Sequence, residues 1–118
     1  MAKGKTIVLW VVSILLAAAF LLSGLSKLLK PEMAKAGFVH YGYAGWFAIF
    51  IGVCETLGGL GLLILRLAGL AAAGLSIIMI GAVYTHFSHR EYQHGMIPLV
   101  LLVLLIGVGY ARVKEARA

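Results

Sequence analysis

The feature that most constrains the fold of this chain is Thr6–Ser26, a long apolar run without a single charged side chain. An α-helix needs about 20 such residues to cross the ~30 Å hydrocarbon core of a bilayer, and this run is long enough. Three more apolar stretches follow it. The sequence therefore predicts an all-α protein, an integral membrane four-helix transmembrane bundle. We expect one membrane domain over residues 1–118, with spans at about 6–29, 43–65, 67–86 and 96–111.

The composition supports a membrane protein and argues against a soluble one. Of the 118 residues, 63% are hydrophobic and only 12% are charged, whereas a soluble domain carries about 25% charged residues. The net charge of +6 would suggest nucleic acid in a soluble protein. Here the basic residues flank the apolar runs, where they act as topology signals and contact lipid headgroups. The expected partner is therefore the lipid bilayer, and no nucleic acid is expected.

The distribution of basic residues predicts the orientation. Four spans place both termini on one side of the membrane, and that side collects six basic residues, namely Lys3, Lys5, Arg66, Arg112, Lys114 and Arg117. The other side has four, namely Lys27, Lys30, Lys35 and Arg90. Because basic residues are enriched in cytoplasmic loops, the sequence predicts a multi-pass protein of the cytoplasmic (inner) membrane with both termini in the cytoplasm.

Glu55 is the first candidate site residue, because it is the only acid inside the apolar run Ile51–Leu63. A carboxylate in the bilayer centre costs roughly 2.5–3.5 kcal/mol on insertion scales, so it is expected to face protein or water. Gly52 and Gly59 share its helix face and would let a neighbouring helix come close. Glu55 could relay protons, coordinate a cation or bind a quinone-like head, or it could be a protonated acid bonded to its neighbours.

Lys27 is the second candidate, close to the end of the first predicted span. It lies near one helix face with Ser13, Phe20 and Ser23. Its ammonium group could reach the interface or turn inward. Counted from the two predicted membrane boundaries, Lys27 and Glu55 differ in depth by roughly 9 Å, which two extended side chains can cover. We therefore predict that Lys27 and Glu55 meet inside the bundle.

The histidines give the remaining candidates. His86 ends a stripe of the third span that contains Leu75, Met79 and Ala82, and Tyr84 and Thr85 beside it could form a polar lid. His86 and His89 are weak candidates for metal ligands, since their spacing matches no closed zinc pattern. No metal is therefore expected. The single cysteine, Cys54, excludes a disulfide framework or paired-thiol chemistry within one chain.

The connections are predicted to be irregular. Lys30–Gly42 is expected to be a polar connection and Phe87–Gly95 a polar loop. Arg66 stands alone between the second and third spans, which predicts a tight turn and antiparallel neighbours. Gly59 and Gly74 are predicted to bring those two helices close together.

Three segments in order carry a resemblance to a known family: Ser23-Gly24-Leu25-Ser26-Lys27-Leu28, then Gly52-Val53-Cys54-Glu55-Thr56-Leu57-Gly58-Gly59, then Ile80-Gly81-Ala82-Val83-Tyr84-Thr85-His86. This order resembles the DoxX-like family. The resemblance implies a small four-helix membrane protein, and some members are named as subunits of quinone-linked sulfur or terminal oxidases. By position, it implies that Lys27, Glu55 and His86 are the functional residues.

These observations lead to one functional hypothesis and two alternatives. The hypothesis is a redox-associated, quinone-linked membrane subunit, with a quinone or similar ligand among Lys27, Glu55, Tyr84 and His86. Whether the chain is an enzyme stays open; if it takes part in catalysis, it would be an auxiliary subunit of a membrane oxidoreductase. The alternatives are a small proton-coupled carrier that uses Glu55 and a non-catalytic structural membrane partner. Oxidoreductase subunits and a homodimer that shares a small-residue face are the expected protein partners.

Overall fold

The computed structural model describes residues 2–117, and over these residues the chain forms five α-helices and no strand. They are α1 (Ala2–Leu29), α2 (Pro31–His40), α3 (Gly45–Leu62), α4 (Leu65–Ser88) and α5 (Tyr92–Arg117). Four of them, α1, α3, α4 and α5, are long and apolar enough to cross a membrane. The prediction of an all-α protein with four membrane-spanning helices is confirmed.

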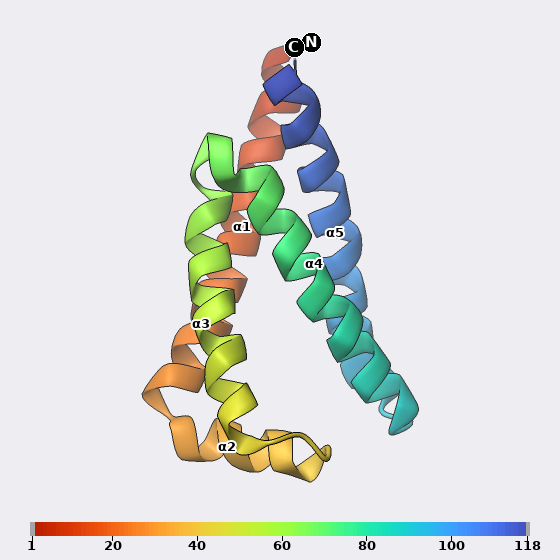
Figure 1. The fold of residues 1–118 in the computed structure, drawn as a ribbon. Coiled ribbons are helices and arrows are strands. Elements are labelled where there is room, and N and C mark those ends of the chain that lie inside the picture. The colour runs from red at the N-terminus through yellow and green to blue at the C-terminus, as the bar shows by residue number, and fades with distance from the viewer. Residues whose placement is uncertain (1, 118) are drawn as a thin grey trace.

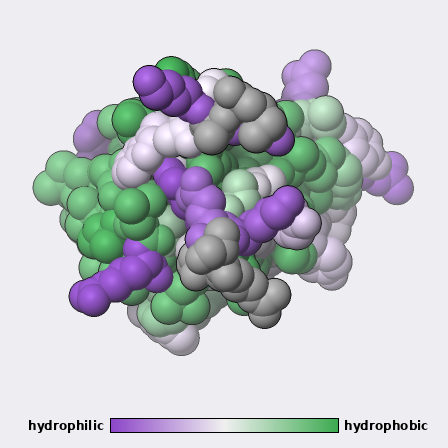
Figure 2. Space-filling model, turned by 90° about the horizontal axis from the view of Figure 1, so that it is seen from above, coloured by the Kyte–Doolittle hydropathy of each residue, from purple (hydrophilic) through white to green (hydrophobic). Residues whose placement is uncertain are grey.

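The four long helices form two pairs. Helix α1 packs mainly against α3, and α4 packs mainly against α5, while α3 and α4 join the two pairs. The pairs converge at the end that carries both termini and diverge towards α2 (Figure 1). Seen from the end with the termini, hydrophobic side chains form most of the outer surface (Figure 2). Such a surface suits lipid rather than water, as a spanning bundle requires.

The core follows the stripes expected from helical periodicity. Phe20, Leu16 and Ser13 of α1 are fully buried, and Leu75 and Met79 of α4 are buried opposite them. Leu105 and Val108 complete this core from α5. Residues that share one helix face in the sequence, Ser13 with Phe20 and Leu75 with Met79, are thus buried together.

Glycines set the distance between α1 and α3. A Cβ atom added at Gly24 would lie 2.7 Å from the Thr56 nitrogen and 2.8 Å from the Gly52 oxygen. Gly52 and Gly59 in turn contact α1, so the small-residue face around Glu55 meets the first helix. Only glycine permits this approach, because any larger residue would overlap backbone atoms that cannot turn away.

The predicted role of Gly59 and Gly74 in joining the second and third spans is wrong. Gly59 faces α1, and a Cβ atom at Gly74 would have nothing within 4 Å. Helices α3 and α4 instead meet where Gly58 lies against Leu75. Their turn consists of residues 63–64, and Arg66 belongs to the first turn of α4 rather than to the connection.

The two predicted connections are shorter than expected. Most of Lys30–Gly42 is helix α2, which Pro31 begins at a position where its missing N–H costs nothing. The predicted loop Phe87–Gly95 shrinks to residues 89–91, because α4 continues to Ser88 and α5 begins at Tyr92. Arg90 makes this turn with a positive φ of 60°. The chain thus has one more helix than predicted, lying across the open end of the bundle.

Candidate functional site

Lys27 and Glu55 form an ion pair inside the bundle. The Lys27 Nζ atom lies 2.8 Å from Glu55 Oε1, which confirms the predicted contact. Lys27 also donates to Ser23 Oγ at 2.8 Å, and Ser23 donates to the same Glu55 oxygen at 3.1 Å. The Glu55 side chain is only 4% exposed, and that of Lys27 is 21% exposed. Glu55 therefore has two hydrogen-bonding partners on α1 and does not stand alone in the bundle.

The local sequence explains this geometry. Ser23 and Lys27 are four residues apart on α1, so both side chains reach the same side of the helix. The close backbone approach at Gly24 and Gly52 then brings Glu55 within reach. A buried pair is tolerated only when hydrogen bonds satisfy its remaining polar atoms, and the Ser23 hydroxyl contributes two of them.

The pair lies at the wall of a cavity of about 310 Å³ to which all four spanning helices contribute. Most of the wall is apolar, with Phe20, Met79 and Leu101 among its residues. Lys27 and Glu55 supply polar groups from the α1/α3 side, and His86 and His94 supply them from the α4/α5 side. The structure thus brings three of the four predicted site residues, Lys27, Glu55 and His86, to one cavity.

His86 belongs to a second polar cluster at the mouth of this cavity. Its Nδ1 atom lies 2.9 Å from Glu91 Oε1, and the Tyr41 hydroxyl donates to the same oxygen at 2.5 Å. This donation and the His86 contact lower the pKa of the Glu91 carboxyl below its ordinary value. The hydrogen bond to Glu91, with burial and the carboxylate charge, raises the pKa of Tyr41. Glu91 is therefore a carboxylate that accepts from both neighbours.

Tyr84 is not brought to the cavity. It is 69% exposed and lies on the outer surface of α4. It precedes His86 by two residues, and side chains at that spacing point to different sides of a helix. Thr85, another member of the predicted lid, is buried, and its Oγ1 atom lies 2.6 Å from the Tyr43 hydroxyl.

His86 and His89 do not converge. The His89 Nδ1 atom lies 2.8 Å from the Thr85 carbonyl oxygen, whereas His86 is bonded to Glu91. Among the residues that the structure describes, no three His, Cys, Asp or Glu side chains are grouped so that they could hold a metal ion.

Sequence reasoning missed Glu91, Tyr41 and Arg112. Glu91 and Tyr41 were assigned to irregular connections, although an acid five residues after His86 was a usable signal. Arg112 was counted as a topology charge, but it is only 3% exposed. Its guanidinium carbon lies 4.5 Å from the centre of the Trp10 ring, and its Nη1 atom donates to Glu115 at 2.9 Å.

Comparison with known protein families identifies the family of this chain. A sequence profile described as the DoxX-like family matches residues 11–108, most of the chain. The chain belongs to the DoxX-like family. No match was found among curated proteins or among solved structures. This DoxX-like protein is therefore a multi-pass membrane protein, and all three residues that the motif resemblance singled out line its internal cavity.

Proposed function

We propose that this DoxX-like protein binds a quinone-like ligand in its internal cavity and serves as a redox-associated membrane subunit. One observation carries the proposal: an apolar cavity of about 310 Å³ within the spanning helices has a charged pair on one side and an imidazole on the other. Ligand sites typically combine an apolar wall with a few polar groups that fix the orientation.

The polar groups suit a head group with oxygen atoms. Lys27 has three N–H donors, and two of them are used by Ser23 and Glu55. The third is available to a ligand oxygen. Phe20, Met79 and Leu101 offer apolar contact to a ring. Ionisable residues inside membranes mark functional sites by default, which supports a binding role for the pair.

The role is that of an auxiliary subunit rather than of a complete oxidoreductase. The chain would hold the ligand and orient its head, and a partner oxidoreductase subunit would exchange electrons with it. A homodimer is a second proposed assembly. The outer face of α4 supports it, because Gly74 and Gly81 have nothing within 4 Å of an added Cβ atom and could admit a second helix.

We also propose that the protein lies in the cytoplasmic (inner) membrane with both termini in the cytoplasm. Two cations counted towards the opposite side are paired, Lys27 with Glu55 and Lys35 with Glu32. The basic residues that remain on that side are Lys30 and Arg90. At the end with the termini there are Lys3, Lys5, Arg66 and Lys114. The side chain of Arg117 lies outside the described residues. This asymmetry favours cytoplasmic termini.

The binding proposal is tested with a short-tailed benzoquinone and purified protein in lipid nanodiscs. Ala82→Leu fills the cavity, and Ala73→Leu makes the same change on the exposed face of the same helix. We expect binding to the wild type and to Ala73→Leu, and at least tenfold weaker binding to Ala82→Leu. Failure of the wild type to bind, or equal binding by both variants, would overturn the proposal.

Two further measurements separate the alternatives. Proton-dependent uptake into liposomes without quinone binding would favour the carrier that uses Glu55. Absence of both activities would favour the structural membrane partner. Mass spectrometry of small molecules that copurify with the protein gives an independent check, since a resident quinone supports the proposal directly.

A further inference from the structure

The cavity offers an unused hydrogen-bond acceptor at Glu55. Its Oε1 atom accepts from both Ser23 and Lys27, whereas Oε2 has no hydrogen-bond partner among the described residues. Oε2 is not fully enclosed, and Glu55 lines the cavity. A carboxylate oxygen can only accept, and this one is therefore suited to a ligand that donates.

His86 provides a second acceptor on the other side of the cavity. Its Nδ1 atom faces Glu91 Oε1, which also receives the Tyr41 hydroxyl and cannot donate in return. Nδ1 must therefore carry the proton, and in the neutral imidazole Nε2 is then an acceptor. No hydrogen bond engages Nε2 in the described part of the chain, and the His86 side chain is 25% exposed.

We infer that the cavity prefers a ligand with hydroxyl donors at opposite ends of its head, the reduced dihydroxy form of an aromatic ligand rather than its oxidised dione. This inference rests on the proposed function and deepens it. Glu55 and His86 line one cavity from different helices, α3 and α4. A benzoquinol offers one hydroxyl to each, and a benzoquinone offers none.

The preference follows from the cost of unpaired acceptors. A dione that fills the cavity would displace water from both acceptors and give them no donor in return. The remaining N–H of Lys27 does not discriminate, because it can donate to a carbonyl or to a hydroxyl oxygen. Sites built to receive a ligand's hydroxyl group reject the analogue that lacks it far more strongly than apolar pockets reject a missing methylene.

Other titratable groups also face this region and are the same in the comparison of the two ligand forms. They are Tyr41 from the α2 end, Glu91 from the turn, His94 from α5 and Lys27 from α1. Both ligand forms are therefore measured at one fixed pH.

The test compares a short-tailed benzoquinone with the benzoquinol made from it, under anaerobic conditions. We expect the quinol to bind about ten- to a hundredfold more tightly, which would raise the midpoint potential of the bound couple by about 30 mV for each tenfold difference. His86→Phe keeps a ring of similar size and removes the acceptor. It should weaken quinol binding about tenfold and leave dione binding unchanged.

His89→Phe is the matched control, because its ring bonds to Thr85 and does not line the cavity. It should leave both affinities unchanged. If the dione binds as tightly as the quinol, or if His86→Phe keeps the full preference, the inference is overturned while the proposed function stands. If neither form binds to the wild type, the proposed function itself fails.

Discussion

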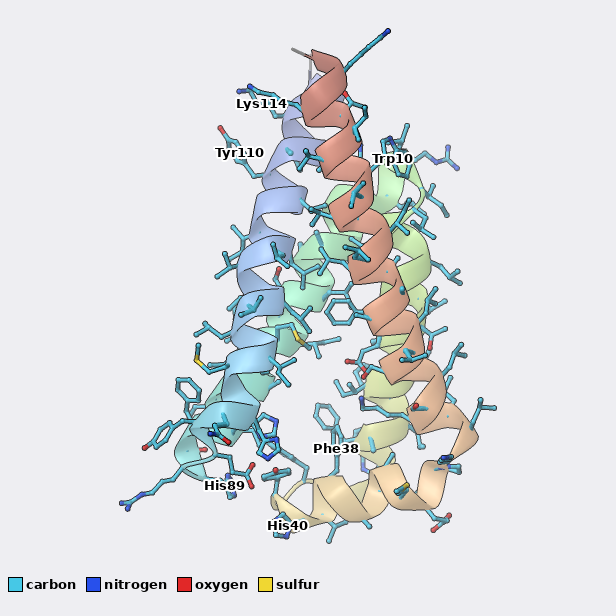
Figure 3. All side chains as sticks on the ribbon, turned by 180° about the vertical axis from the view of Figure 1, so that it is seen from behind. Trp10, Phe38, His40, His89, Tyr110 and Lys114 are labelled. Atoms are coloured by element: carbon cyan, nitrogen blue, oxygen red, sulfur yellow. The ribbon has the colours of Figure 1, made fainter. Side chains whose placement is uncertain are left out.

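Two cations, the partly buried Lys27 and the buried Arg112, stand at opposite ends of this bundle, and their surroundings differ. Lys27 lies near the end where the helix pairs diverge, and its partner Glu55 is buried. Arg112 contacts the ring of Trp10, which lies with Lys114 near the end that carries the termini (Figure 3). The side chain of its partner, Glu115, is 47% exposed. The Nε and Nη2 atoms of Arg112 are buried and have no hydrogen-bond partner among the described residues.

This difference separates a cation that faces a cavity from a cation that fills the space between helices. Lys27 can offer a donor to a ligand, because its side chain lines the cavity with Glu55. Arg112 is covered by an aromatic face and is only 2% exposed at its side chain. Arginine stacks well on aromatic rings, so it can close the narrow end of the bundle. The open end is therefore the place where we expect a ligand to enter.

The largest expected effect concerns the Lys27–Glu55 pair. Lys27→Met or Glu55→Gln should each reduce the free energy of unfolding by about 3–5 kcal/mol, because one buried charge or polar group loses its partner. The double variant should lose much less than the sum. Thermal unfolding in detergent measures all three, and losses that simply add would show that the two residues do not stabilise each other.

Arg112→Met provides the comparison at the other end. It removes two buried nitrogens without partners as well as the contact with Trp10. These effects oppose each other, so we expect a net loss of only about 1 kcal/mol, within the range of a single cation–π contact. A loss as large as that of Lys27→Met would contradict the distinction between the two cations.

An effect smaller than that of Lys27→Met, but larger than that of Arg112→Met, is expected at the glycine that lets α1 approach α3. Gly24→Ala places a Cβ atom within 3 Å of two backbone atoms and should cost about 1–3 kcal/mol of stability through overpacking. Gly74→Ala makes the same change where nothing lies within 4 Å, and it should be neutral or stabilising by up to about 1 kcal/mol. Equal melting temperatures for the two variants would show that the close approach does not matter.

The smallest effect concerns the hydrogen bond from Tyr41 to Glu91, which links the end of α2 to the turn after α4. The pKa of Glu91 is lowered, so its contribution to folding is present above its ordinary value of 4.5 and is lost as the pH falls through the lowered value. The raised pKa of Tyr41 means that its contribution is present below 10.0 and is lost as the pH rises further. The link should therefore be strongest between these two limits.

Hydrogen exchange of α2 tests this pH dependence. Protection of its amides, corrected for intrinsic exchange, should fall in strong acid in the wild type. In Glu91→Gln it should be low already at neutral pH and change little. Glu32→Gln alters an exposed carboxylate on α2 itself and serves as the matched control. Unchanged protection in Glu91→Gln would contradict a role for Glu91 in holding α2.

The sequence alone determined the membrane bundle and one wall of the site. Span length and the absence of charge fix which segments cross a bilayer, because lipid offers no partner for polar groups. Helical periodicity placed Gly52, Glu55 and Gly59 on one face and Leu75, Met79 and His86 on another. Side-chain reach was then enough to predict the Lys27–Glu55 contact, since a charge at that depth needs a partner.

The tertiary structure decided which faces meet and what closes each end. Periodicity shows that Gly59 and Gly74 lie on particular faces, but not that one meets α1 and the other meets no helix. Helix α2 escaped prediction because it has only ten residues, too few to span a membrane, and carries little helix signal apart from Pro31. The bond of Glu91 to Tyr41, and the burial of Arg112 beside Trp10, join residues far apart in the chain. Such contacts depend on how helices converge and diverge, which no local pattern encodes.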